Sequence, residues 1–189
     1  MVTVILILMY GSGFVFVPIS IFAVAFCMIR GKGVSHRILV LFASLLCAVL
    51  IICFGGQAIL TLFDMGWRCT PFNTMLFLVA MLFIATLCFG MRELSVIKGS
   101  NSIEFGCGLI SMLFVIVITL FSLFAYFQNF SWHDGLTTYN DQTIVYANDQ
   151  HGGSCAWQYY THINDLVHGA EILQESGWIG NPPHYFSSN

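Results

Sequence analysis

Residues 38–63, ILVLFASLLCAVLIICFGGQAILTLF, contain no charged side chain. A helix needs about 20 consecutive apolar residues to cross the hydrocarbon core of a bilayer, and this stretch is longer. It therefore predicts a membrane-spanning helix, with a helix break expected at Gly55-Gly56-Gln57. Three further stretches have the same character: 2–29, 71–91 and 103–127.

The composition of the whole chain agrees with this prediction. Of the 189 residues, 58% are hydrophobic and 8% are charged, whereas soluble domains carry about 25% charged residues. The first stretch lacks a basic segment before it and exceeds the length of a signal-peptide core, so we expect it to be retained as a span. The fold class predicted is an all-α membrane protein, with a four-transmembrane-helix bundle over residues 1–127 (spans at about 2–29, 38–63, 71–91 and 103–127).

The basic residues predict the orientation of this bundle. Arg30, Lys32 and Arg37 lie between the first two spans, and Arg92 and Lys98 lie between the last two. Short loops rich in Lys and Arg stay on the cytoplasmic side. Both termini are then expected on the non-cytoplasmic side. We expect the plasma membrane to hold this integral, multi-pass protein, with an organellar membrane as the alternative.

Residues 128–189 differ sharply from the spans, since they contain no Lys or Arg and many polar and aromatic residues. They predict a small extracytoplasmic C-terminal module of irregular and α structure. Thr143–Tyr146 predicts one short strand. Residues 154–176 predict an amphipathic helix, because apolar residues recur there at helical spacing, namely Ile163, Leu166, Val167, Ala170 and Leu173.

The sequence predicts one disulfide and contains one candidate glycosylation site on the non-cytoplasmic side. Cys69 and Cys155 are the two cysteines outside the spans, and disulfides form in oxidising compartments. A Cys69–Cys155 disulfide would tie the tail to the middle loop; two free thiols are the alternative. Asn129-Phe130-Ser131 is a glycosylation sequence, although it directly follows the fourth span.

The search for chemistry gives weak candidates only. His151, His162 and Asp165 have ligand side chains, but their spacing matches no structural zinc pattern, and a solvated surface explains them better. We predict no metal and no cofactor. The sequence contains no G-x-S-x-G, HExxH or glycine-rich phosphate loop, so no enzyme activity is predicted. It also lacks the basic surface that nucleic-acid binding requires.

Helix contacts within the membrane are predicted at a patch of small residues, Gly106, Gly108 and Ser111, which would allow close approach of a neighbouring helix. Exposure of this patch to lipid is the alternative. The deeper parts of the spans carry Ser, Thr and Cys as their polar residues. Because ion and proton paths usually use charged groups, transport by a single copy is not expected.

By elimination, the sequence favours a structural or accessory subunit of a larger membrane protein complex, docking through its helices and its C-terminal module. Its expected partners are the lipid bilayer and other membrane protein subunits, in a hetero-oligomer or in a homo-oligomer. Two alternatives stay open. One is a self-assembling pore or small carrier, and the other is a metal-binding redox subunit on the outer face.

Overall fold

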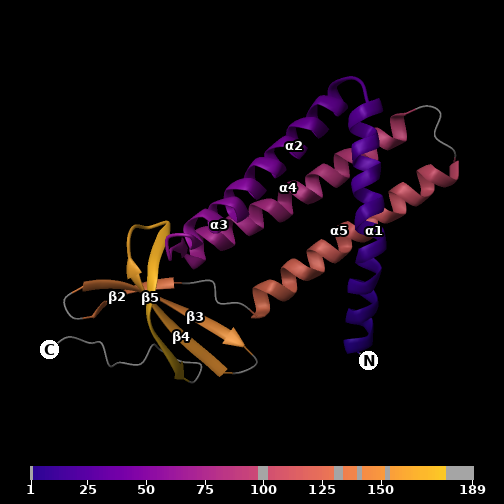
Figure 1. The fold of residues 1–189 in the computed structure, drawn as a ribbon. Coiled ribbons are helices and arrows are strands. Elements are labelled where there is room, and N and C mark those ends of the chain that lie inside the picture. The colour runs from indigo at the N-terminus through magenta and orange to yellow at the C-terminus, as the bar shows by residue number, and fades with distance from the viewer. Residues whose placement is uncertain (1, 98–101, 130–133, 140–141, 152–153, 178–189) are drawn as a thin grey trace. The chain divides into compact units, whose positions relative to one another are not determined.

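The computed structural model describes residues 2–97, 102–129, 134–139, 142–151 and 154–177. The helices come from the first two thirds of the chain, and all strands except one follow them (Figure 1). In chain order the elements are α1 (Val2–Arg30), α2 (Val34–Leu50), the π-helix η1 (Ile51–Gly55), α3 (Gly56–Thr61), β1 (Gly66–Trp67), α4 (Cys69–Val96), α5 (Ser102–Asn129), β2 (Asp134–Tyr139), β3 (Gln142–His151), β4 (Ser154–His162) and β5 (Val167–Gly177).

Four helical segments are long and apolar enough to cross a membrane, as the sequence predicts. They are Gly13–Arg30, Val34–Thr61, Cys69–Val96 and Phe105–Tyr126, with mean hydropathy between 2.1 and 3.0. The second segment is continuous through Gly55-Gly56-Gln57, where η1 passes directly into α3. The helix break expected there was wrong. Helix α4, which is the third of these segments, extends beyond the predicted stretch 71–91 and includes Arg92 and Glu93.

The C-terminal part of the chain contains a five-stranded antiparallel sheet in the order β1-β5-β4-β3-β2. The predicted strand Thr143–Tyr146 lies within β3. The helix predicted over Ser154–Ser176 is wrong, because β4 and β5 cover that stretch, and the module is therefore not the irregular and α structure expected.

Local chemistry explains why this stretch forms a hairpin. Trp157, Tyr159, Tyr160 and Thr161 are residue types that favour strands. The side-chain oxygen of Asn164 accepts the backbone N–H groups of Leu166 and Val167 at 2.8 and 2.9 Å. Such a bond from Asn to the following backbone makes a turn. The apolar residues that suggested a helical period thus belong to a turn and to the strand after it.

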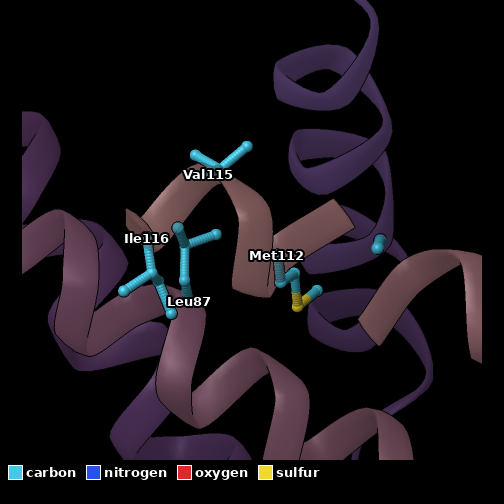
Figure 2. Close-up of a cluster of buried hydrophobic side chains, with 5 residues drawn as sticks. Leu87, Met112, Val115 and Ile116 are labelled. Carbon is cyan, nitrogen blue, oxygen red and sulfur yellow. The ribbon is translucent and has the colours of Figure 1, made fainter. Parts of the chain in front are cut away.

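The chain divides into two compact units. The helical unit comprises Met1–Val49 and Leu78–Phe124, and the junction unit comprises Leu50–Phe77 and Ala125–Asn189. The helical unit packs along buried stripes of helical period: Ser20, Ala23 and Cys27 on α1, Thr86, Leu87, Gly90, Glu93 and Leu94 on α4, and Gly108, Ser111, Met112, Val115 and Ile116 on α5. Figure 2 shows Leu87 of α4 beside Met112, Val115 and Ile116 of α5.

Candidate functional site

The loop that joins α3 to α4 is part of the sheet, and it forms the candidate site of the junction unit. Gly66 and Trp67 of β1 pair with His168 and Val167 of β5. The backbone N–H of Arg68 continues this pairing, since it donates to the carbonyl of Leu166 at 2.9 Å. The connection between two candidate spans is therefore also the first strand at one edge of the sheet.

Trp67 fixes this loop to the π-helix η1. Its indole N–H donates to the carbonyl of Cys53 at 3.2 Å, and its backbone N–H donates to the side-chain oxygen of Gln57 at 3.2 Å. A Cβ atom on Gly56 would lie 2.8 Å from the Trp67 ring. Only glycine leaves room for the ring here. Gly56 thus provides a surface for Trp67 rather than a break in the helix.

Asp134, the first residue of β2, binds the beginning of α4. Its carboxylate accepts from the Arg68 guanidinium, from the Thr70 hydroxyl at 2.7 Å and from the Thr70 backbone N–H at 3.3 Å. The side chains of Arg68 and Asp134 are 10% and 1% exposed. An acid near a helix N-terminus also interacts favourably with the helix dipole. Asp134 therefore joins the sheet to α4 by charge and by hydrogen bonds.

These bonds decide the ionisation of Asp134. Burial alone would raise the pKa of this carboxyl, but the hydrogen bonds from Arg68 and Thr70 and the charge of Arg68 outweigh it, so its pKa lies below the ordinary value. A second acid, Asp165, has its Oδ1 atom 3.5 Å from Nη1 of Arg68 and is 94% exposed. Asp134 is the principal partner of Arg68, because it alone of the two is shielded from water.

A hydrogen bond between helices completes the junction unit. The hydroxyl of Tyr126, near the end of α5, donates to the side-chain oxygen of Asn73 in α4. Asn73 is 5% exposed. The ends of α4 and α5 that belong to this unit are therefore connected to each other, and α4 is connected to the sheet through Asp134.

The backbone does not bring together the three weak candidates for metal ligands, His151, His162 and Asp165. His151 pairs with Ser154 at one end of β4, and His162 lies at the other end, opposite His168. At about 3.3 Å per strand residue, these two ends are ~25 Å apart. Asp165 lies beside Arg68. Across the residues that the structure describes, no group of three or more His, Cys, Asp or Glu side chains has a geometry suited to a metal ion.

His162 and His168 have different surroundings. The ring of His168 packs on Tyr160 with centroids 4.0 Å apart, and its Nδ1 atom lies 2.9 Å from the carbonyl oxygen of Gly169. A Cβ atom on Gly66 would lie 2.8 Å from Nε2 of His168. The Nε2 atom of His162 is buried and has no hydrogen-bond partner among the described residues. His168 thus helps to pack β1 on β5.

The strand register gives no support to the predicted Cys69–Cys155 disulfide. Cys155 pairs with Gly177 at the far end of β5, whereas Cys69 follows β1, which pairs near the beginning of β5. The distance between these ends is ~30 Å, and a disulfide needs Cα atoms within about 7 Å. The side chain of Cys155 lies outside the described residues, so the bond stays a prediction.

The predicted glycosylation site begins at the end of a helix. Asn129 is the last residue of α5, and Phe130 and Ser131 lie outside the described residues.

Of the predicted contact patch on α5, Gly108 and Ser111 are buried. A Cβ atom on Gly108 would lie 2.9 Å from Leu94 of α4 and 3.7 Å from Ala23 of α1. Gly106 has no described neighbour within 4 Å of such an atom. The close approach is therefore made at Gly108, and Ser111 is buried on the same helix.

The helical unit contains a buried polar cluster that the sequence analysis missed. Glu93 is 1% exposed, and its Oε1 atom accepts the backbone N–H of Lys32 at 3.2 Å. A Cβ atom on Gly31 would lie 2.6 Å from Nδ1 of His36 and 2.7 Å from Oε1 of Glu93. The signal was present, since Glu93 continues the helical spacing of Leu87 and Gly90.

Comparison with protein-family models, with curated proteins and with solved structures finds no match to this chain. The functional argument therefore depends on the residues themselves. The contacts of the junction unit are an ion pair, hydrogen bonds and ring packing. Their chemical effect is to hold a small sheet on the ends of apolar helices.

Proposed function

We propose that this chain is a small multi-pass membrane protein that serves as a structural or accessory subunit of a larger membrane complex. Its helices pack in the bilayer beside other subunits. Its sheet docks on those subunits at the non-cytoplasmic surface. The distribution of Lys and Arg supports this orientation. The plasma membrane is the expected location.

The observation that carries this proposal is the attachment of the sheet within the junction unit. Asp134 and Arg68 form a buried ion pair, β1 pairs with β5, and Trp67 binds the π-helix. A module held in one orientation binds a partner at a lower entropic cost than a module on a free linker. Three separate attachments favour a docking role over that of a tethered tail.

The strand β2 is the docking edge that we propose. It lies at the end of the sheet order, so one side of its backbone has no neighbouring strand among the described residues. Leu136 of β2 is 49% exposed. Exposed edges accept added strands from partners.

Co-purification from native membranes tests the proposal. The tagged full chain, extracted in mild detergent, is expected to migrate as a hetero-oligomer in native electrophoresis. Leu136→Lys should weaken the association, because it places a charge at the docking edge. Leu166→Lys is the matched control, since Leu166 is also exposed, at 57%, but lies in the turn between β4 and β5. A monodisperse monomer would contradict the proposal, and a homo-oligomer that conducts ions in planar bilayers would favour the pore instead.

A further inference from the structure

An apolar groove of about 350 Å³ lies in the helical unit, on the surface of three candidate membrane-spanning helices. Its lining is almost entirely apolar and comprises Ile19, Phe22, Ala23 and Phe26 of α1, Leu94 of α4, and Cys107 and Gly108 of α5. The absence of a side chain at Gly108 keeps the groove deep, because a Cβ atom there would already lie 2.9 Å from Leu94.

The size and setting of the groove restrict its occupant. Small-molecule pockets measure about 300–1,000 Å³, and this groove of about 350 Å³ lies at the small end of that range. Its size and apolar lining suit a single hydrocarbon chain. The lining residues belong to helices that are long and apolar enough to cross a membrane. In a bilayer the medium that fills an apolar groove on such helices is lipid hydrocarbon rather than water.

A cation lies next to this apolar lining. Arg30 is exposed and is the last residue of α1, and its guanidinium carbon lies 5.9 Å from the centroid of the Phe26 ring. Arginine binds phosphate through a planar set of donors. Glu93, beside Leu94 in the sequence, is 1% exposed and accepts from Lys32. Its carboxylate therefore does not present a competing charge at the surface.

We propose that the groove binds one acyl chain of a glycerophospholipid whose phosphate is held by Arg30. The chain lies along α1 in the groove lined by Leu94 and Gly108, and the headgroup stays at the bilayer surface with the guanidinium. This site depends on the helical unit alone. It holds for either orientation of the protein and whether or not the sheet docks on a partner.

Retention of defined lipids by the purified full chain tests the site. The protein is exchanged into detergent with phosphatidylglycerol, phosphatidylcholine or diacylglycerol, and bound lipid is counted by native mass spectrometry. We expect both phospholipids to be retained, and diacylglycerol, which has no phosphate, to be retained about fivefold less. One arginine near a headgroup is worth a factor of about five in affinity, so Arg30→Gln should weaken phospholipid retention about fivefold.

Matched variants separate the site from general lipid binding. Arg37→Gln removes an exposed charge in α2 that does not line the groove, and it should leave retention unchanged. Gly108→Leu fills the groove and should abolish retention, whereas Gly106→Leu, at a position with no described neighbour within 4 Å, should not. Because Gly108→Leu is crowded, Cys107→Phe provides a second way to fill the groove from an exposed position.

Three results would overturn the proposal. If diacylglycerol and the phospholipids are retained equally, and Arg30→Gln does not change this, Arg30 does not bind the phosphate. If the Cys107→Phe and Gly108→Leu proteins keep the wild-type helical circular dichroism and still retain phospholipid, the groove is not the binding site. Loss of lipid in the Arg37→Gln or Gly106→Leu control as complete as in its matched variant would show binding without a specific site.

Discussion

Among the described residues, each of the two compact units contains one buried carboxylate, and the hydrogen-bond partners of these two carboxylates differ. Asp134 of the junction unit accepts from a guanidinium, a hydroxyl and a backbone N–H. Glu93 of the helical unit accepts from the backbone of Lys32, and its second oxygen is buried with no hydrogen-bond partner among the described residues. The comparison shows that burial alone does not reveal how much a carboxylate contributes to stability, because this contribution depends on its hydrogen-bond and charge partners.

The largest expected effect comes from removing the partner of Asp134. Arg68→Ala leaves a buried carboxylate without its opposing charge, which typically costs about 3–5 kcal/mol. Denaturant unfolding of the sheet, followed by tyrosine and tryptophan fluorescence, should show this loss. Asp165→Ala is the control and should change little, because Asp165 is 94% exposed. If both variants unfold like the wild type, the ion pair does not hold the junction.

Acid should release the same contact reversibly. The pKa of Asp134 is lowered by folding from the ordinary value of 3.8. A carboxyl of lowered pKa contributes stability that is fully present above pH 3.8 and is lost as the pH falls through the folded-state pKa. The denaturant concentration at which the sheet is half unfolded should therefore decrease as the pH is lowered below 3.8. In Asp134→Asn this part of the pH dependence should be absent. Identical acid profiles of the two proteins would contradict the lowered pKa.

A smaller loss of stability is expected in the helical unit, around Glu93. Gly31→Ala places a Cβ atom within 2.7 Å of the Cys27 carbonyl oxygen, His36 and Glu93. Overpacking of this kind costs about 1–3 kcal/mol. Thermal unfolding in detergent, followed by helical circular dichroism, should show a lower midpoint than for Gly13→Ala, whose added Cβ meets nothing within 4 Å. Equal midpoints would mean that the cluster around Gly31 is loose.

The smallest effect is expected for Glu93→Gln. The amide keeps an oxygen that can accept from Lys32, and it removes a charge that has no cationic side chain bonded to it among the described residues. The net value of one such hydrogen bond is about 1 kcal/mol, and a buried charge without an opposing charge is itself unfavourable, so any loss of unfolding free energy should stay below that value. The same unfolding assay measures it. A loss as large as that of Arg68→Ala would show that Glu93 is also held by a charge.

The sequence predicted the helices well and the sheet poorly, for a physical reason. A span has a length set by the bilayer, so residues 38–63 could be recognised from composition alone. The hairpin of β4 and β5 depends on cross-strand pairs such as Tyr159 with Leu173, and those partners are not visible in a local period. Aromatic residues and the turn at Asn164 were the available signal, and they were outweighed by the apparent helical spacing of Ile163, Leu166 and Val167.

The candidate site was missed for a related reason. Arg68 and Asp134 are separated by more than sixty positions in the chain, and nothing in either local sequence marks the other as its partner. Trp67 and Gln57 are nearer, but their contact depends on the π-helix, which no periodicity predicted. The patch of Gly106, Gly108 and Ser111, by contrast, lies on one helix, so a local pattern was sufficient to suggest it. Gly108 and Ser111 are buried there, and Gly106 has no described neighbour within 4 Å of an added Cβ atom.

The π-helix η1 also sets the angular position of everything that follows it in the second span. A π turn holds one more residue than an α turn, and each residue of an α-helix turns the chain by about 100°. Deletion of one residue between Ile51 and Gly55 would restore a regular helix and rotate Gln57 and Gly56 away from Trp67. The deletion of a single residue in an apolar segment would thus change how β1 of the sheet is attached to the second span. The π-helix therefore determines the geometry of this attachment.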